Sequence, residues 1–260
     1  MKKNHPFHMT NYSPWPFMLM LNLFFLSISF INLFYYKFYK SLMMNLFLLM
    51  LVMYQWWRDV IRESTFLGNH SSFIVKNLKW SMMMFIISEL FFFFGIFWSF
   101  FHSSLSPTVE IGLNWPPLNI CILNPLQIPL LNTLILLMSG MTITWSHYSL
   151  HLNLFKYSFL SLSITIILGI MFSILQMYEY MSLKFSISDS IYGSLFFFMT
   201  GFHGFHVLIG TLFLIICLIR LFFNHFSKTH MFGIESASWY WHFIDMVWLF
   251  LYIFLYWWGK

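Results

Sequence analysis

Apolar residues dominate the chain in long runs, and short polar segments separate one run from the next. A membrane-spanning helix needs about 20 apolar residues, and seven runs reach or approach that length. They cover residues 15–34, 41–57, 80–101, 128–150, 157–178, 191–223 and 234–257. The second run is short and can continue as a polar helical extension through RDVIREST, whereas the sixth is long enough to tilt or protrude. The pattern predicts an all-α polytopic membrane protein with seven transmembrane helices.

Composition supports the same class. Hydrophobic residues make up 60% of the chain and charged residues only 8%, whereas a soluble domain carries about 25% charged residues. The two cysteines, Cys121 and Cys217, are far apart and lack CxxC spacing, which argues against a disulfide framework or a zinc site. Basic residues lie between the apolar runs, so they indicate headgroup contacts rather than a domain that binds nucleic acid.

The basic residues also predict an orientation, because an odd number of crossings places the two termini on opposite sides. Nine of the 13 Lys and Arg residues fall on the N-terminal side and four on the other. The N-terminus is therefore expected in the positive-inside compartment, either a bacterial cytoplasm or an organelle matrix. Residues 1–14 are expected to form a tail on that side, and residues 15–260 a single transmembrane domain.

Two further features concern packing. The longest connection, residues 103–127, holds four of the eight prolines, and its Trp-Pro-Pro restricts the backbone, so we expect an ordered interfacial loop. Small and polar residues recur at helical spacing in the third and fourth runs, and such stripes favour helix-packing seams in lipid. The residues are Ser88, Gly95, Ser99 and His102 in the third run, and Thr133, Gly140, Thr144, His147 and His151 in the fourth.

Glu89 stands inside the apolar stretch FIISELFFFFGIFW, where water is scarce. A charged side chain at the bilayer centre costs about 2.5–3.5 kcal/mol on insertion scales. Desolvation favours the neutral acid, so Glu89 is a candidate for proton exchange. The alternative is a neutral acid that hydrogen-bonds to a neighbouring helix and has only a structural role.

The last two runs contain more polar residues at helical spacing. Glu235, His242 and Asp245 are separated by seven and three positions, and His203 and His206 are three apart in TGFHGFHVLIG. Three histidines with a carboxylate could bind a metal, but neither HExxH nor another paired His–carboxylate signature is present. A polar network between two packed helices explains the same residues without a metal.

The segment YQWWRDVIREST, residues 54–65, places two tryptophans before a run of charged side chains. This order is typical of an aromatic belt followed by charges at headgroup level. Such a cluster can hold a phospholipid headgroup, although ordinary interfacial placement explains it equally well.

A series of motifs, spread over almost the whole chain, resembles subunit III of mitochondrial cytochrome c oxidase. In order they are MYQWWRDVIREST, FIISE with the following FFFGIFW, FHSSLSPT, LNPLQIPLLNT, SGMTITWSHYSL, TGFHGFHVLIGT and WYWHFIDMVWLFLY. Any one of them is moderately specific, but seven in sequence are highly specific.

The resemblance implies seven transmembrane helices, of which the first two are splayed from a bundle of five, with a lipid-holding cleft between. It implies a mitochondrial inner-membrane location with the N-terminus in the matrix and the C-terminus on the intermembrane-space side. It also implies that the chain itself carries no redox centre, since haem and copper belong to partner subunits. The chain is expected to bind phospholipids, to pack mainly on subunit I and to contact other subunits of the complex.

The resemblance assigns roles to particular residues. Glu89 matches the family's buried carboxylate that reacts with carbodiimides and is held to support proton uptake. The residues that match lipid-binding regions are Trp56, Trp57, Arg58, Glu63, His70, Arg220 and His225. Two segments depart from the pattern: RLFFNHF lacks a lysine that some relatives carry, and EIGLNWPP lacks a usual Gly pair.

The sequence therefore predicts a non-redox core subunit of an oxidase that transfers electrons from cytochrome c to oxygen and pumps protons. An independent proton-coupled transporter, using Glu89 and the face of His242 and Asp245, is the alternative, although no inverted repeat is evident. A metalloenzyme using His203, His206 and His242 is a third interpretation.

Overall fold

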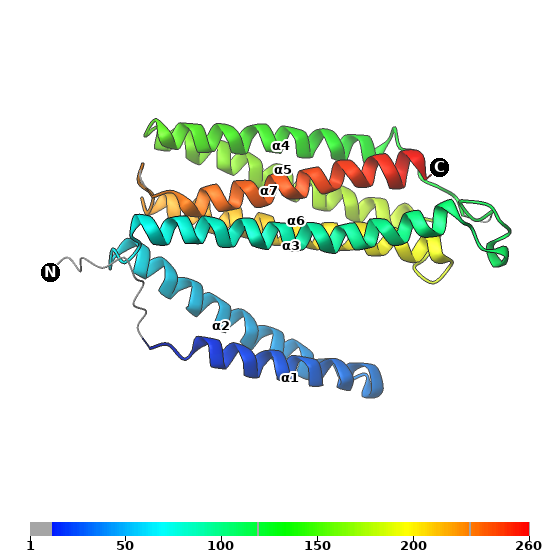
Figure 1. The fold of residues 1–260 in the computed structure, drawn as a ribbon, viewed down its shortest axis with the longest axis horizontal. Coiled ribbons are helices and arrows are strands. Elements are labelled where there is room, and N and C mark those ends of the chain that lie inside the picture. The colour runs from blue at the N-terminus through cyan, green and yellow to red at the C-terminus, as the bar shows by residue number, and fades with distance from the viewer. Residues whose placement is uncertain (1–11, 119, 229, 260) are drawn as a thin grey trace. The chain divides into compact units, whose positions relative to one another are not determined.

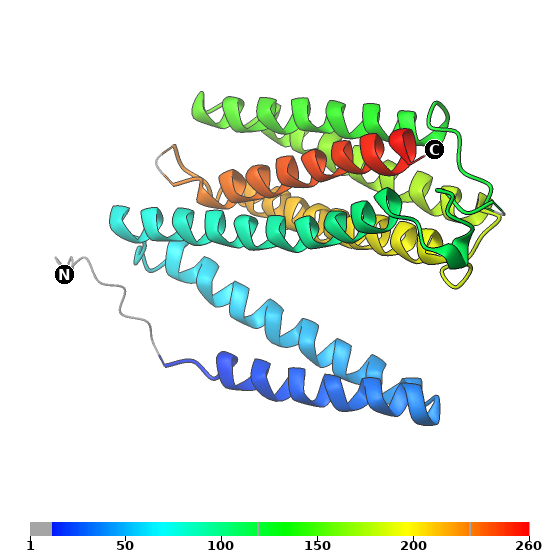
Figure 2. The same ribbon diagram turned by 45° about the vertical axis from the view of Figure 1, so that its right-hand side comes forward.

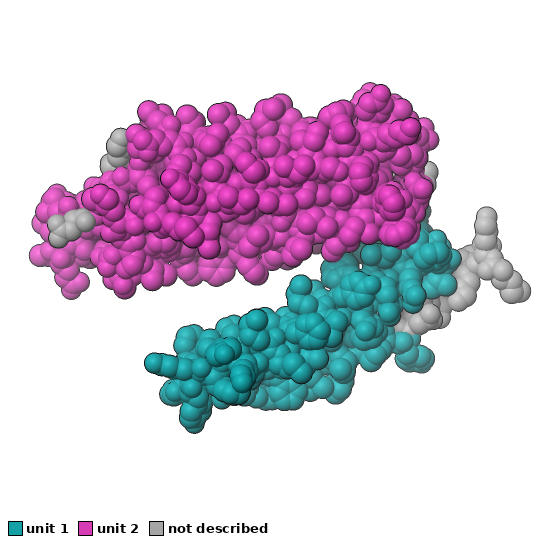
Figure 3. Space-filling view, turned by 180° about the vertical axis from the view of Figure 1, so that it is seen from behind, with its two compact units in different colours: residues 1–78 teal, residues 79–260 magenta. Residues whose placement is uncertain are grey.

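The computed structural model describes residues 12–118, 120–228 and 230–259, and these residues form helices and loops without a β-strand. The chain divides into two compact units, residues 1–78 and 79–260, which Figure 3 shows in separate colours. The division between Leu78 and Lys79 falls within a helix, near its start.

The first unit contains two long helices, α1 (Trp15–Tyr36) and α2 (Tyr39–Thr65). Pro16 lies in the first turn of α1, where backbone N–H groups have no intrahelical acceptor, so the missing N–H of proline costs no hydrogen bond. Lys37 ends α1 with a left-handed backbone (φ 53°), and its N–H bonds to the carbonyl of Leu33. α2 continues eight residues past Trp57, so the polar extension expected from RDVIREST is confirmed as helix.

The second unit contains most of α3 (Ser72–Leu105), followed by α4 (Ile128–His151), α5 (Phe155–Ser182), α6 (Ile191–Phe222) and α7 (Phe232–Leu251). A π-helix, η2 (Tyr252–Trp258), continues α7 to the C-terminal end. α4 packs on α5, α5 on α6, α6 on α7 and α7 back on α4, which closes a four-helix bundle (Figures 1 and 2).

Large rings and small residues together determine the core of this bundle. Trp241 of α7 is fully buried, and its Nε1–H donates to Ser139 Oγ on α4 at 2.8 Å. A Cβ at Gly169 would lie 2.7 Å from this indole ring, and one at Gly210 would lie 3.0 Å from it. Glycine is therefore required at both positions for α5 and α6 to approach Trp241.

α3 packs on the bundle through aromatic side chains rather than through a small-residue seam. Phe93 lies 5.2 Å from the His206 ring and 6.1 Å from Phe243, while Phe101 lies 5.0 Å from Phe254, all between ring centroids. Ser88 is exposed, and a Cβ at Gly95 would meet open space. The small-residue seam expected on α3 is therefore wrong within this chain. Aromatic rings lie between α3 and the four-helix bundle and keep the backbones further apart than a small-residue seam would.

The expected seam of α4 is partly correct. Thr133 and Gly140 are buried, whereas Thr144 and His151 are exposed. A direct contact with α5 is made instead by Ser146, whose hydroxyl lies 3.1 Å from that of Ser158. Small hydroxyl residues thus bring α4 and α5 together on a neighbouring face.

The connection after α3 contains a single turn of 3-10 helix, η1 (Val109–Ile111), and a cis peptide bond between Trp115 and Pro116. The indole of Trp115 packs edge-on against Phe100 and Tyr192, at centroid distances of 5.7 and 5.6 Å. Residues 106–118 and 120–127 lie at the same end of this unit as the C-terminus, and the turns around 153 and 225 lie at the other end (Figure 1).

Six of the seven long helices are long and apolar enough to span a membrane: α1, α3, α4, α5, α6 and α7 with its π-helical continuation. Together with the helical content, this agrees with the expected all-α polytopic membrane protein. α2 is long but carries a charged C-terminal third, so its composition alone does not mark it as a span. The splay of the first two helices from the other five stays a prediction.

Candidate functional site

Glu89 of α3 faces His206 of α6. The carboxylate Oε2 lies 3.5 Å from His206 Nε2, and the Glu89 side chain is 23% exposed. On the other side of the imidazole, Nδ1 lies 3.0 Å from the hydroxyl of Tyr240 on α7. The proton-accepting tautomer of His206 is the one in which Nδ1–H donates to the Tyr240 hydroxyl, which leaves the lone pair of Nε2 facing the carboxyl group.

Aromatic rings enclose this Glu89–His206–Tyr240 row. Phe93 packs on the imidazole, and Phe85 lies 6.1 Å from the Tyr240 ring between centroids. The rings exclude water from the imidazole while Glu89 stays partly open. An acid, an imidazole and a phenol therefore lie in one row across three helices, an arrangement that can hold and pass a proton.

His203 lies one turn before His206 but has different neighbours. Its Nε2 lies 3.3 Å from the carbonyl oxygen of Ile244, and its ring lies between Phe172 and Trp248 at centroid distances of 5.5 and 5.1 Å. Residues three apart on a helix diverge by about 60° around the axis, because a turn contains 3.6 residues. His203 therefore points into the four-helix bundle, whereas His206 points toward α3.

The three polar residues of α7 divide between two separate contacts. His242 Nδ1 lies 3.9 Å from Asp245 Oδ2, and a Cβ at Gly140 of α4 would come within 3.0 Å of the same oxygen. Glu235 instead forms an ion pair with Lys79 of α3, at 2.5 Å between Oε2 and Nζ. The network expected from His203, His206, Glu235, His242 and Asp245 is thus corrected to four separate contacts.

A metal site is a poor fit for these histidines. His203 is capped by a backbone carbonyl, His206 lies between Glu89 and Tyr240, and His242 faces outward with 42% of its side chain exposed. Within the described residues, no group of three or more His, Cys, Asp or Glu side chains could hold a metal ion.

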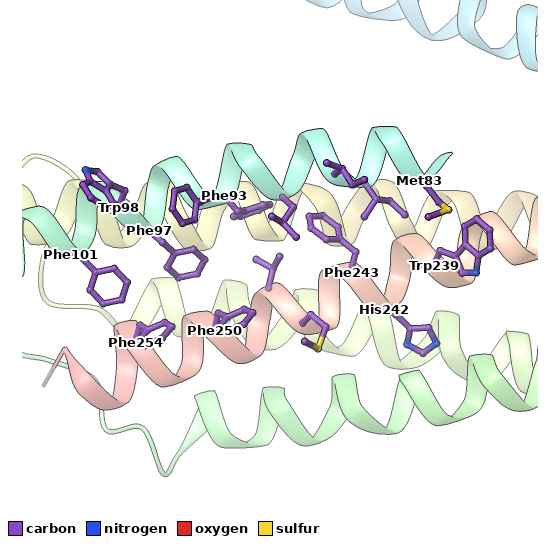
Figure 4. Close-up of a pocket in the computed structure, with 16 residues that line it drawn as sticks. Met83, Phe93, Phe97, Trp98, Phe101, Trp239, His242, Phe243, Phe250 and Phe254 are labelled. Atoms are coloured by element: carbon purple, nitrogen blue, oxygen red, sulfur yellow. The ribbon is translucent and has the colours of Figure 1, made fainter. Parts of the chain in front are cut away.

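An apolar groove runs along the line where α3 and α7 face each other (Figure 4). Its volume is about 970 Å³, and Phe, Trp, Met, Leu, Ile and Val side chains form its walls. Of the 16 residues that line it, His242 alone is ionisable. The groove is therefore suited to hydrocarbon, with one polar group near Trp239.

The residues expected to contact lipid fall in both units. In the first, Trp57 is 58% exposed and Arg58 bonds Asp59 Oδ1 through Nε and Nη2 at 3.1 and 3.0 Å, while Trp56, Glu63 and His70 are partly buried. Asp59 also accepts a hydrogen bond of 2.6 Å from the indole of Trp15. The hydrogen bond from Trp15 lowers the pKa of Asp59 below its usual range, which holds the carboxylate charged beside Arg58.

In the second unit, Arg220 lies at the C-terminal end of α6. Its guanidinium carbon is 4.5 Å from the centre of the Phe226 ring, and a Cβ at Gly233 would clash with Nη1 at 2.6 Å. Burial, and next the charge of Arg220, lower the pKa of nearby His225. Arg220 is therefore the cation of this pair at neutral pH.

Glu179 of α5 is a buried acid that sequence reasoning missed. It is fully buried and accepts a hydrogen bond of 2.5 Å from the hydroxyl of Tyr256. The fifth apolar run ends at Tyr178 by sequence, which places Glu179 at the headgroup level, but α5 continues to Ser182. A signal was present in the spacing of Gln176 and Glu179, which share a face three residues apart.

Comparison with known proteins identifies close relatives along the entire chain. The sequence model of the family "Cytochrome c oxidase subunit III" matches residues 5–260. A protein named cytochrome c oxidase subunit 3 from Osphranter robustus is 54% identical over 258 residues, which cover 99% of each chain. A protein of the same name from Drosophila melanogaster is 53% identical, and the match covers 98% of each chain. One from Myxine glutinosa is also 53% identical, and the match covers 100% of this chain and 99% of the relative.

Proposed function

Because this chain belongs to the cytochrome c oxidase subunit III family and is therefore a subunit of the oxidase complex, we propose that it is the non-redox core subunit that supports proton uptake by that complex. Its place is the mitochondrial inner membrane, with the N-terminus in the matrix. Its main partner is subunit I, which carries haem and copper, and it contributes to assembly of the complex.

The observation that carries the proton role is the row Glu89–His206–Tyr240. Glu89 is open enough to exchange a proton with its surroundings, whereas His206 and Tyr240 are buried behind it. A carboxyl group that faces an imidazole can pass its proton to Nε2, and the hydroxyl on Nδ1 holds the ring in the orientation this transfer needs. Such a row stores a proton at a point where the bare carboxylate would be costly.

Phospholipid binding is the second part of the proposal. Arg220, held by Phe226, offers a cation at the end of α6 where a headgroup phosphate would lie, with His225 beside it. Trp56, Trp57, Arg58, Glu63 and His70 form a comparable interfacial set in the first unit. The groove between α3 and α7 supplies an apolar surface suited to an acyl chain.

The proton role is tested by Glu89→Gln in the intact oxidase complex. We expect slower proton uptake and faster loss of activity over many turnovers, because the amide keeps the shape of the side chain but cannot exchange a proton. Glu110→Gln is the matched control, since Glu110 is an exposed acid in η1, far along the chain from His206. If both variants retain activity through the same number of turnovers and take up protons at the wild-type rate, the role of Glu89 is wrong.

A further inference from the structure

Glu179 lies deep among aromatic and hydroxyl side chains. Its side chain is fully buried, as is Thr200 of α6, and Tyr256 of η2 is 1% exposed. Tyr192 of α6 lies within electrostatic range of the same carboxyl group. These groups come from three helical elements and meet near the end of the second unit that also holds the C-terminus (Figure 1).

The π-helix places Tyr256 on Glu179. A π-helical turn widens the backbone and rotates the residues after it, and such turns are frequent at functional sites. In η2 the rotation brings the Tyr256 hydroxyl within 2.5 Å of Glu179 Oε1, where it donates a hydrogen bond. One oxygen of the carboxyl group is thereby satisfied.

The remaining polar atoms of this cluster lack a hydrogen bond of good geometry to any described residue. They are Glu179 Oε2 and both Nε2 and Oε1 of Gln176, a side chain that is only 5% exposed and lies beside the hydroxyls of Tyr180 and Tyr256. Leaving a buried polar atom unpaired costs about 1–3 kcal/mol, so the unpaired Glu179 Oε2 beside the poorly satisfied amide of Gln176 favours a bridging ligand. A ligand that satisfies a carboxyl oxygen and an amide together must be a small group that both donates and accepts hydrogen bonds.

Charge favours the neutral acid. In the described parts of the chain, the ion pairs of Lys, Arg and His go to Asp59, Glu89, Asp245 and Glu235, and none goes to Glu179. A buried carboxylate without a cation is costly in hydrocarbon, whereas a neutral carboxyl group needs only a hydrogen-bond acceptor for its proton. Gln176 Oε1, three residues earlier on the same face of α5, is such an acceptor, directly or through water.

We propose that Glu179, Gln176 and Tyr256 form a second proton-holding site, in which the carboxyl group is neutral and exchanges its proton through a bound water molecule. The Tyr256 hydroxyl donates to Oε1, the proton lies on Oε2, and the water bridges Oε2 to the amide of Gln176. A buried water typically makes about three hydrogen bonds, and these atoms provide them. Partly buried Tyr180, whose hydroxyl donates to Thr200 Oγ1 at 2.8 Å, lies beside Gln176.

Infrared spectroscopy of the intact oxidase complex tests this proposal. We expect Glu179→Gln to lose one carbonyl band of a protonated carboxyl group, and we expect that band to shift when the wild-type complex is moved from H₂O to D₂O. Tyr256→Phe should keep the band but move it to higher frequency, because the carbonyl loses its donor. Glu110→Gln, at an exposed acid, should leave the band unchanged.

The proposal is overturned if Glu179→Gln removes no protonated-carboxyl band, or if the band does not shift in D₂O. Should Glu179→Gln fail to assemble, Tyr256→Phe and Gln176→Leu decide the question. The site predicts that the carboxyl band moves in Tyr256→Phe and that its D₂O exchange is slower in Gln176→Leu. If neither change is observed, the site is contradicted. None of these readings depends on turnover or on Glu89, so the proton-uptake proposal can fail independently.

Discussion

A polar side chain inside a membrane helix acquires its role from the neighbour it meets. Glu89 meets an imidazole, Glu235 meets an ammonium group and Glu179 meets a phenol. The three acids occur in similar apolar sequence, yet one faces a buried histidine, one forms an ion pair and one is a buried hydrogen-bonded acid. Only the partner distinguishes these cases.

Asp59 gives a pH prediction at this scale. Trp15 lowers its pKa, so the folded state binds the proton more weakly than the unfolded state. The stability that this hydrogen bond contributes is fully present above the ordinary Asp pKa of about 3.9 and is lost as pH falls through the lower, folded pKa. Trp15→Phe should therefore lower the thermal stability of the complex equally from pH 8 to pH 5, and the difference from wild type should shrink below about pH 4.

Trp57→Phe is the control for this measurement, because Trp57 is 58% exposed and its indole makes no hydrogen bond with a described residue. Thermal dissociation of this chain from the purified complex, followed across the pH series, provides the readout. Equal losses for Trp15→Phe and Trp57→Phe at neutral pH would show that the indole–carboxylate bond contributes nothing.

At the scale of elements, the helices of the second unit use two kinds of packing. α4 to α7 approach closely where glycine and serine leave room, as at Gly169 and at the Ser146–Ser158 contact. α3 has no such seam and instead packs through rings. Lipid is as apolar as the side chains, so exclusion from water gives the helices little reason to associate. Both kinds of packing are therefore stabilised mainly by van der Waals contacts between close-fitting side chains.

Phe93→Ala tests the aromatic packing of α3. Phe93 is 3% exposed and contacts both His206 and Phe243, so its truncation should cost about 3–5 kcal/mol through lost contacts and the cavity left behind. Phe94→Ala removes the same group from a position that is 60% exposed and should cost at most about 0.5 kcal/mol. Denaturant-induced dissociation of this chain from the complex measures both, and similar midpoints for the two variants would contradict the packing described.

At the scale of the whole molecule, the number of crossings determines where the termini lie. Six helices have the length and apolarity of spans, and α2 is the seventh long helix. If α2 also crosses, the termini lie on opposite sides, in line with the nine basic residues on the N-terminal side and four on the other.

Thiol labelling tests this topology. Cys121 is exposed in the connection before α4, at the end of its unit that holds the C-terminus, whereas Cys217 is 1% exposed (Figure 1). A membrane-impermeant maleimide should therefore modify Cys121 in mitoplasts but not in inside-out vesicles, and Cys217 should stay unmodified in both. Labelling of Cys121 only in inside-out vesicles would reverse the orientation.

The sequence by itself determined the class of the protein, the position of each long helix and the presence of Glu89 in an apolar segment, because run length and composition are local properties. It misplaced the end of the fifth run by four residues, which hid Glu179, and it grouped His203, His206, Glu235, His242 and Asp245 into one network. Tertiary structure decided that His206 faces Glu89, that Lys79 pairs with Glu235 and that Tyr256 reaches Glu179. These contacts depend on the rotation and depth of whole helices relative to one another, and residues far apart along the chain determine both.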